Sequence, residues 1–88
     1  MPELWVVYLV RCRDGSLYCG VAVDVEERIA RHNSGRGARY TRGRGPVELA
    51  GLSRAMSRGD ALRLEQRIKR SPRSRKLALL LAEGGEGA

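Results

Sequence analysis

One acidic residue of this chain stands where an apolar residue would be expected. In the segment from 57 to 70, the residues that would line the buried stripe of a helix are Ala61, Leu64 and Ile68. At about 100° per residue, Glu65 lies about 40° from Ala61 on that helix. The helix would therefore point a carboxylate inward, and burying an unpaired charge costs a great deal of free energy. Glu65 must then be protonated, paired or bound to a cation.

Two explanations of this inward carboxylate remain open at the level of sequence. One of the many arginines could neutralise Glu65, which would make the acid a structural residue. Alternatively, Glu65 could bind a metal ion, because Mg²⁺ is commonly held by a single carboxylate together with waters and substrate phosphate.

Two tyrosines could bring their hydroxyl groups to the same site. Tyr8 and Tyr18 lie in consecutive strand-like segments joined by a turn, so the turn decides whether they share a face. A two-residue turn would put the two rings on opposite faces of the sheet. A three-residue loop with Gly15 in the left-handed conformation would put both rings on one face. It would also set Gly20 opposite Tyr8, leaving room for a ligand beside the phenol. Both tyrosines could equally be ordinary strand residues.

Arg28 and His32 have the i, i+4 spacing that brings two side chains together on one face of a helix. A solvated arginine beside a partly packed histidine would explain this pair as well as a functional site would. His32 is the only histidine, and Cys12 and Cys19 lie in different strands, so a zinc-type ligand cluster is set aside. The two cysteines should point to opposite sheet faces, and we expect them to be reduced.

Periodicity and start signals predict the elements that position these residues. Three segments have strand character, at about residues 4–10, 17–21 and 46–52. Three segments have helix character, at about residues 25–33, 58–70 and 72–82. Asp24 is the expected N-cap of the first helix, Pro46 opens the third strand, and Pro72 takes the first position of the last helix. Residues 34–45, rich in glycine and arginine, fit neither period and should form a mobile loop.

The composition points to a small basic domain. The 88 residues carry a net charge of +7, and 15 of the 17 cationic side chains are arginines. We expect one domain over residues 1–82 and a disordered tail over 83–88. Such a charge excess favours a polyanionic partner. Neither a membrane-spanning apolar run nor a secretion signal is present, so we expect a cytoplasmic protein without membrane contact.

The positive charge is concentrated in the middle of the chain. No acidic residue occurs between Arg28 and Val47, a stretch that holds six arginines. A charge excess around a glycine-rich loop is typical of nucleic-acid contact. The residues expected to make that contact are Arg36, Arg39, Tyr40, Arg42, Arg44 and Lys69.

In this order and spacing, these residues resemble the GIY-YIG nuclease domain family, and in particular its small single-domain bacterial members. The first signature triplet aligns with residues 6–8 and the second with residues 18–20. The family's first helix carries the arginine and the histidine that align with Arg28 and His32, and its metal-binding glutamate aligns with Glu65. The resemblance covers about residues 4–82.

This resemblance implies a fold, a reaction and a set of roles. The fold would be α+β, with a small three-stranded antiparallel sheet flanked by helices in the order β-β-α-β-α-α. The reaction would be phosphodiester hydrolysis with one Mg²⁺ or Mn²⁺ held by Glu65. Tyr8 would act as the base or position the attacking water, and Tyr18 would be an orienting hydrogen-bond partner. Arg28 would clamp the phosphate, and His32 would contact the phosphate or relay a proton.

Several departures from the family pattern bear on function. Val6, Val7 and Cys19 replace signature residues at packing positions, whereas the late asparagine of some active members has no counterpart after Glu65. Tyr40 lies where some members place another polar active-site residue. Because no DNA-recognition domain is appended, we expect a monomeric endonuclease that reads DNA structure rather than sequence, or one directed by a partner protein.

Two other functions are compatible with the composition. A nucleic-acid-binding module could keep the fold without useful turnover. A protein-interaction adaptor would need an exposed apolar patch, which an arginine-rich surface disfavours.

Overall fold

The computed structural model of the chain describes residues 3–37 and 41–87. The elements in chain order are β1 (Val6–Arg11), β2 (Leu17–Ala22), α1 (Val25–Asn33), β3 (Glu48–Leu52), α2 (Arg58–Lys69), α3 (Arg73–Ala82) and β4 (Glu86–Gly87). The strands form one antiparallel sheet in the order β2-β1-β3-β4. The predicted α+β fold and its element order are confirmed through α3, and β4 is a short addition at the edge.

The loop between β1 and β2 fixes the register that sequence left open. Gly15 has a φ of 86°, and the N–H of Cys12 donates to the carbonyl of Ser16 over 2.8 Å. This is the three-residue loop, and it pairs Tyr8 with Gly20 and places Tyr18 opposite Val10. Because side chains alternate across a strand, Tyr8 and Tyr18 point to the same face of the sheet.

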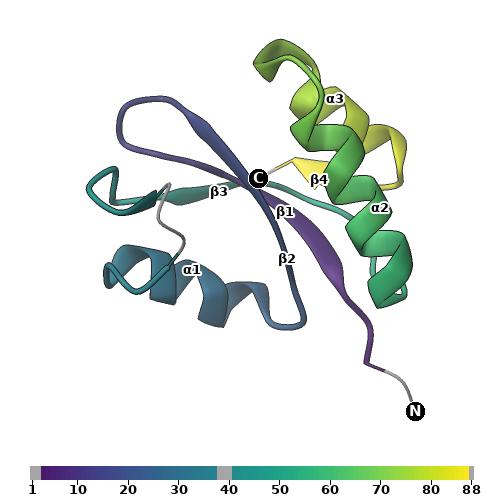
Figure 1. Cartoon of the computed structure of the whole chain (residues 1–88), viewed down its shortest axis with the longest axis horizontal. Helices are drawn as coiled ribbons and strands as arrows, with labels where there is room; N and C mark the ends of the chain where they lie inside the picture. Colours follow the sequence, from purple (N-terminus) through teal and green to yellow (C-terminus); the bar gives the residue numbers. More distant parts are fainter. Residues whose placement is uncertain (1–2, 38–40, 88) are drawn as a thin grey trace.

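Each face of the sheet is covered by different helices. Val7 and Leu9 of β1 belong to a core with side chains of α2 and α3. The alternate residues Tyr8 and Val10 belong to a second core that includes side chains of α1. In Figure 1, α1 accordingly lies on one side of the strands, and α2 and α3 lie on the other. The sheet thus separates two small cores.

Both cysteines are free and buried, as predicted. Cys12 packs in the core on the α1 side and Cys19 in the core on the side of α2 and α3. A disulfide between them would have to cross the sheet.

The helices begin at or near their predicted starts. The Asp24 carboxylate accepts from the backbone N–H of Glu27 over 3.1 Å, and Ser57 caps α2 in the same manner through Asp60 N–H. The prediction for Pro72 was wrong by one position. Pro72 has a ψ of 150° and is the N-cap, because that extended angle lies outside the helical range.

β3 begins at Glu48, two residues later than predicted. The side chain of Asn33 explains the difference. Its Oδ1 accepts from the N–H of Val47 over 2.6 Å, and its Nδ2 donates to the carbonyl of Val47 over 3.2 Å. An amide side chain therefore takes both backbone groups of Val47, which would otherwise bond to a neighbouring strand.

The segment after α3 is ordered by pairing rather than free. We expected a disordered tail, whereas Glu86 and Gly87 pair with Leu52 and Gly51 at the edge of β3. Gly85 makes this turn possible, because a Cβ there would lie 2.6 Å from the carbonyl oxygen of Leu80. Within residues 3–37 and 41–87, no helix combines the length and apolar character that a membrane crossing requires.

Candidate active site

Three polar side chains form a buried chain on the α1 face of the sheet. The hydroxyl oxygen of Tyr8 on β1 lies 3.0 Å from Nε2 of His32 on α1. Nδ1 of the same ring lies 2.8 Å from Oγ1 of Thr41. Their exposed fractions are 1%, 3% and 1% for Tyr8, His32 and Thr41. Both nitrogens of His32 therefore have partners, which fixes the plane of the ring.

Two glycines make room for this chain. A Cβ on Gly20 would lie 2.4 Å from the hydroxyl oxygen of Tyr8, and a Cβ on Gly37 would lie 2.2 Å from Nδ1 of His32. Either contact is too short for any side chain to tolerate without movement. The space expected for a ligand beside Gly20 is therefore filled by the phenol of Tyr8 itself. Gly20 is needed so that Tyr8 can lie flat against β2.

The environment keeps both Tyr8 and His32 neutral. Burial, followed by the charge of Arg28, lowers the pKa of His32 below its usual 6.5. Burial raises the pKa of Tyr8, the nearby Tyr18 phenol adds to the rise, and Arg28 opposes it without reversing it. Arg28 alone therefore does not turn Tyr8 into a ready base. A neutral imidazole carries one proton, so one ring nitrogen of His32 is an acceptor.

Tyr18 joins the chain from the neighbouring strand and is more open to solvent. Its ring centre lies 5.3 Å from that of His32, edge to face, and 6.4 Å from that of Tyr8. Nζ of Lys69 lies 5.9 Å from the centre of the Tyr18 ring. Burial raises the pKa of Tyr18, and the Lys69 charge opposes this. The structure thus brings the two signature tyrosines, His32 and Lys69 into one cluster.

Glu65 points inward from α2, as its helical position predicted. It is 9% exposed, and its Oε2 lies 3.4 Å from Nζ of Lys69. The cation beside it is therefore a lysine and not the arginine that sequence suggested. Burial, and secondly the charge of Glu65, raise the pKa of the Cys19 thiol to about 12. Glu65 likewise acts against ionisation of Tyr18. Nζ of Lys69 lies near both groups, 3.4 Å from the Glu65 carboxylate and 5.9 Å from the centre of the Tyr18 ring on β2.

Arg28 approaches the same cluster from α1. Its charge opposes the raised pKa values of Tyr8 and Tyr18 and contributes to the lowered pKa of His32. Nε of Arg28 is buried and has no hydrogen-bond partner among the residues that the structure describes. A buried N–H without an acceptor is costly and uncommon. An anionic oxygen, such as that of a phosphate, would satisfy it.

The donor set fits one kind of metal site and excludes another. In the described part of the chain, no group of three or more His, Cys, Asp or Glu side chains could enclose a metal ion. Both ring nitrogens of His32 are engaged, so Glu65 is the available protein ligand. A single hard carboxylate suits Mg²⁺ or Mn²⁺ when water and substrate phosphate supply the remaining oxygens. A zinc site does not fit.

The residues expected to contact nucleic acid do not all lie in one place. Arg36 and Arg42 are exposed beyond α1, and Nε of Arg44 lies 3.4 Å from a carboxylate oxygen of Asp14 at the tip of the hairpin. Lys69 lies in the cluster itself, beside Glu65. The other two expected contacts, Arg39 and Tyr40, lie outside the described residues.

Sequence reasoning missed two contributors to the site. Thr41 lies in the segment expected to be a mobile loop, and nothing in its spacing indicates that it is buried against His32. Gly37 lies in the same segment, where one glycine cannot be distinguished from another. Thr41 and Gly37 can be identified as site residues only from the folded structure, because they contact His32 from a loop whose sequence has no periodicity.

Comparison with known proteins gives concordant results. A family model described as the GIY-YIG catalytic domain matches residues 4–78. A UPF0213 protein of Nitratidesulfovibrio vulgaris is 55% identical over 84 residues, covering 96% of this chain and 76% of the relative. A UPF0213 protein of Vibrio cholerae is 49% identical over 81 residues, covering 91% and 80%. The solution NMR structure of a UPF0213 protein from Bacillus halodurans is 43% identical, covers 92% of this chain and 86% of that one, and has a TM-score of 0.55.

Proposed function

The chain belongs to the GIY-YIG catalytic domain family, and on that premise we propose that it is a metal-dependent endonuclease acting on DNA. The family is one of nuclease-type domains, which implies a nucleic-acid substrate. The reaction that we propose is the hydrolysis of phosphodiester bonds with Mg²⁺ or Mn²⁺ as the metal ion. Recognition would depend on the structure of the DNA, because a small arginine-rich module offers little surface for reading bases.

One observation carries this proposal. Tyr8, Tyr18 and His32 are in contact with one another. Lys69 lies near both the Tyr18 ring and the Glu65 carboxylate. The charge of Arg28 acts on both tyrosines and on His32. Together these side chains combine a lone carboxylate, an unsatisfied guanidinium N–H and a hydrogen-bonded phenol–imidazole pair. Metal-assisted hydrolysis of a phosphodiester requires a ligand for the metal ion, a hydrogen-bond donor to the phosphate and a path for a proton.

The roles follow from what each group can reach. Arg28 would bind a non-bridging oxygen of the scissile phosphate through its free Nε–H and hold it in place. Glu65 would hold the metal ion, which supplies neutralisation of charge on the phosphate and the leaving oxygen. Lys69 balances Glu65 before the substrate binds. Tyr18, beside both groups, would orient the attacking water.

The buried chain would move the proton of that water. With Nδ1–H of His32 donating to Thr41, Nε2 accepts from the hydroxyl of Tyr8. As water attacks phosphorus, its proton passes to the oxygen of Tyr8 while the Tyr8 proton passes to Nε2. The P–O bond to the leaving oxygen then breaks, that oxygen takes a proton from solvent, and the proton gained by His32 returns to solvent through Tyr8 when the product leaves. Because burial raises the pKa of Tyr8, we expect the two transfers to be concerted.

An alternative function is favoured by one specific observation. Tyr8 is only 1% exposed, so an attacking water can reach its hydroxyl only when substrate binding opens the site. If the site does not open, the domain would bind nucleic acid through its arginines without cutting it. The two functions differ in whether Glu65 is needed.

Glu65→Gln tests the proposal, because it removes the charge and keeps the shape. The matched control is Glu27→Gln, since Glu27 is also paired with a cation at i+4, at 3.2 Å from Arg31, but lies on the outer side of α1. Both proteins and the wild type are incubated with labelled single-stranded, nicked, flapped and branched DNA and RNA, in Mg²⁺, Mn²⁺ or chelator. Cleavage and binding are measured together.

Metal-dependent cleavage that is lost in Glu65→Gln and kept in Glu27→Gln, with binding unchanged, is the expected result. Cleavage that survives Glu65→Gln would remove the metal role of Glu65. Salt-sensitive binding by all three proteins with no cutting of any substrate would establish the binding module instead.

A further inference from the structure

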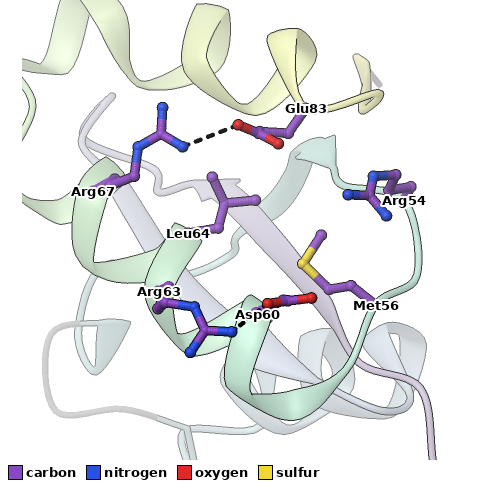
Figure 2. Close-up of a pocket in the computed structure, with 7 residues that line it drawn as sticks. All are labelled: Arg54, Met56, Asp60, Arg63, Leu64, Arg67 and Glu83. Atoms are coloured by element: carbon purple, nitrogen blue, oxygen red, sulfur yellow. Dashed lines mark hydrogen bonds and ion pairs between the residues drawn. The ribbon is translucent and has the colours of Figure 1, made fainter.

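A hollow lined by three arginines lies on the other side of α2 from Glu65. Its volume is about 340 Å³, within the range of roughly 300–1,000 Å³ in which small-molecule sites fall. Met56 and Leu64 form its apolar floor, and Arg54, Arg63 and Arg67 stand around it. Figure 2 shows Leu64 and Met56 surrounded by the three guanidinium groups, with the carboxylates of Asp60 and Glu83 on the same rim, beside Arg63 and Arg67. The rim therefore carries three cationic and two anionic side chains over an apolar floor.

The position on α2 separates this hollow from the candidate active site. At about 100° per residue, Leu64 and Arg67 are turned about 100° and 160° from Glu65 around the helix axis. Glu65 lies on the flank of α2 next to β2, whereas Arg67 lies on the flank next to the end of α3, where its Nη1 is 3.0 Å from Glu83. The hollow is therefore a site of its own.

The arginines of the hollow are held in place but keep N–H donors that are free to bind a ligand. Arg63 pairs with Asp60 one turn earlier, and Arg67 pairs with Glu83. Each guanidinium has five N–H donors, and both side chains are more than half exposed, so these pairs are weak and leave donors for a ligand. The stem of Arg54 packs at Gly84, where a Cβ would lie 3.3 Å from its Cδ.

We propose that this hollow binds one nucleotide unit of a single-stranded nucleic acid, with its phosphate on the arginines and its unstacked base on Met56 and Leu64. Guanidinium groups suit phosphate oxygens because their donors form a planar fork. Bases removed from the stack are bound on apolar or aromatic surfaces. The carboxylates of Asp60 and Glu83 orient the arginines and can accept hydrogen bonds from the amino group of a base.

The inference rests on the proposed function in one respect: the ligand is a nucleotide because the proposed substrate is a nucleic acid. It adds that a single strand beside the cleavage point is held across α2, with one nucleotide in the hollow. Substrates with a single-stranded segment, such as flaps, would then be preferred over intact duplex. The same chemistry would also accept a free mononucleotide, so the test must separate these two sources.

The test is a titration of the ¹⁵N-labelled full chain followed by amide chemical shifts. The probes are cytidine 5′-monophosphate, inorganic phosphate and a six-residue deoxycytidine strand. The variant is Arg54→Gln with Arg67→Gln, and the control is Arg75→Gln with Arg31→Gln. Those control arginines are exposed and lie outside the hollow, so the same charge is removed elsewhere. The dispersion of each spectrum checks folding.

We expect the six-residue strand to shift the amides of Met56, Leu64 and Glu83 and to bind more tightly than the mononucleotide. The double variant should weaken this binding about tenfold or more, and the control much less. If inorganic phosphate shifted the same amides as strongly as the mononucleotide, the base would make no contact with the hollow, and the proposal would be overturned. Tighter binding of the mononucleotide than of the strand would identify a free-nucleotide site instead.

Two outcomes separate this inference from the proposed function. If the strand shifts only the amides around Tyr18, Arg28 and His32, the hollow is not used and the inference fails while the endonuclease proposal stands. If shifts occur at the hollow and the Glu65→Gln variant still cleaves, the metal role fails while the hollow remains a binding site.

Discussion

The hydroxyl of Tyr8 and the imidazole of His32 are 24 residues apart in sequence and 3.0 Å apart in the fold. The contact crosses from β1 to α1 and is possible because Gly20 and Gly37 leave space for the two side chains. Burial keeps the imidazole neutral at neutral pH, because it lowers the pKa of His32. A neutral imidazole can accept the phenol proton, whereas an imidazolium could not. The proposed proton path therefore depends on packing as much as on the residues themselves.

Tyr8→Phe removes the hydroxyl and keeps the ring that fills the space over Gly20. We expect cleavage to fall about 10²–10⁴-fold, the contribution typical of a positioned proton-transfer group. The free energy of unfolding should fall by about 1–3 kcal/mol, because Nε2 of His32 loses a buried partner. The cleavage rate and the nucleic-acid affinity of the variant are measured together, and urea denaturation gives its free energy of unfolding. Wild-type cleavage by the variant would eliminate Tyr8 from the reaction.

Gly20→Ala should displace the phenol, because the new methyl group would overlap the Tyr8 hydroxyl. We expect a loss of about 1–3 kcal/mol of stability, as for overpacking in a core, and a loss of cleavage. Gly59→Ala is the control. Its Cβ would meet Arg63 at an ordinary 3.6 Å, and alanine in a helix should stabilise by about 0.5–1 kcal/mol. Urea denaturation compares the two, and equal stability changes would show that Gly20 has no special role.

The lowered pKa of His32 predicts a pH dependence of stability. As the pH falls below 6.5, the ordinary value, the unfolded chain binds a proton that the folded chain does not. Stability from His32 is therefore complete above that value and decreases as the pH falls toward the folded-state pKa. The stability difference between wild type and His32→Asn should be smaller at about pH 5 than at about pH 7.5. An identical difference at both pH values would show that the His32 environment does not perturb its titration.

Arg28→Lys keeps the positive charge and removes the buried Nε–H. We expect nucleic-acid affinity to change by less than about threefold, because the charge remains, and cleavage to fall about 10–100-fold, because a lysine cannot reproduce the planar fork. Arg31→Lys, one turn away on the exposed side of α1 and paired with Glu27, is the matched control. Equal cleavage by the two variants would remove the clamp role from Arg28.

Local signals were sufficient for most of the elements. The capping residue Asp24 and the apolar periodicities placed the helices close to their observed ends, because capping and period are properties of a few neighbouring residues. Pro72 was misplaced by one residue, since proline is compatible with either position at a helix start. β3 was predicted too long because the bonds of Asn33 to Val47 come from a residue 14 positions away.

The amino-acid sequence by itself determined the inward position of Glu65, the charge that favours a polyanion, and the family. Each depends on spacing or composition along one segment. It left open the face on which the tyrosines lie, which the loop at Gly15 decided. It also gave no sign that Thr41 would hold His32. The pairing of Glu65 with Lys69, by contrast, has the i, i+4 spacing that a helix brings together, and this spacing is present in the sequence. Only the tertiary structure decided the face of the tyrosines and the position of Thr41. The first depends on the backbone conformation of the loop at Gly15, and the second is a contact between a loop residue and a helix.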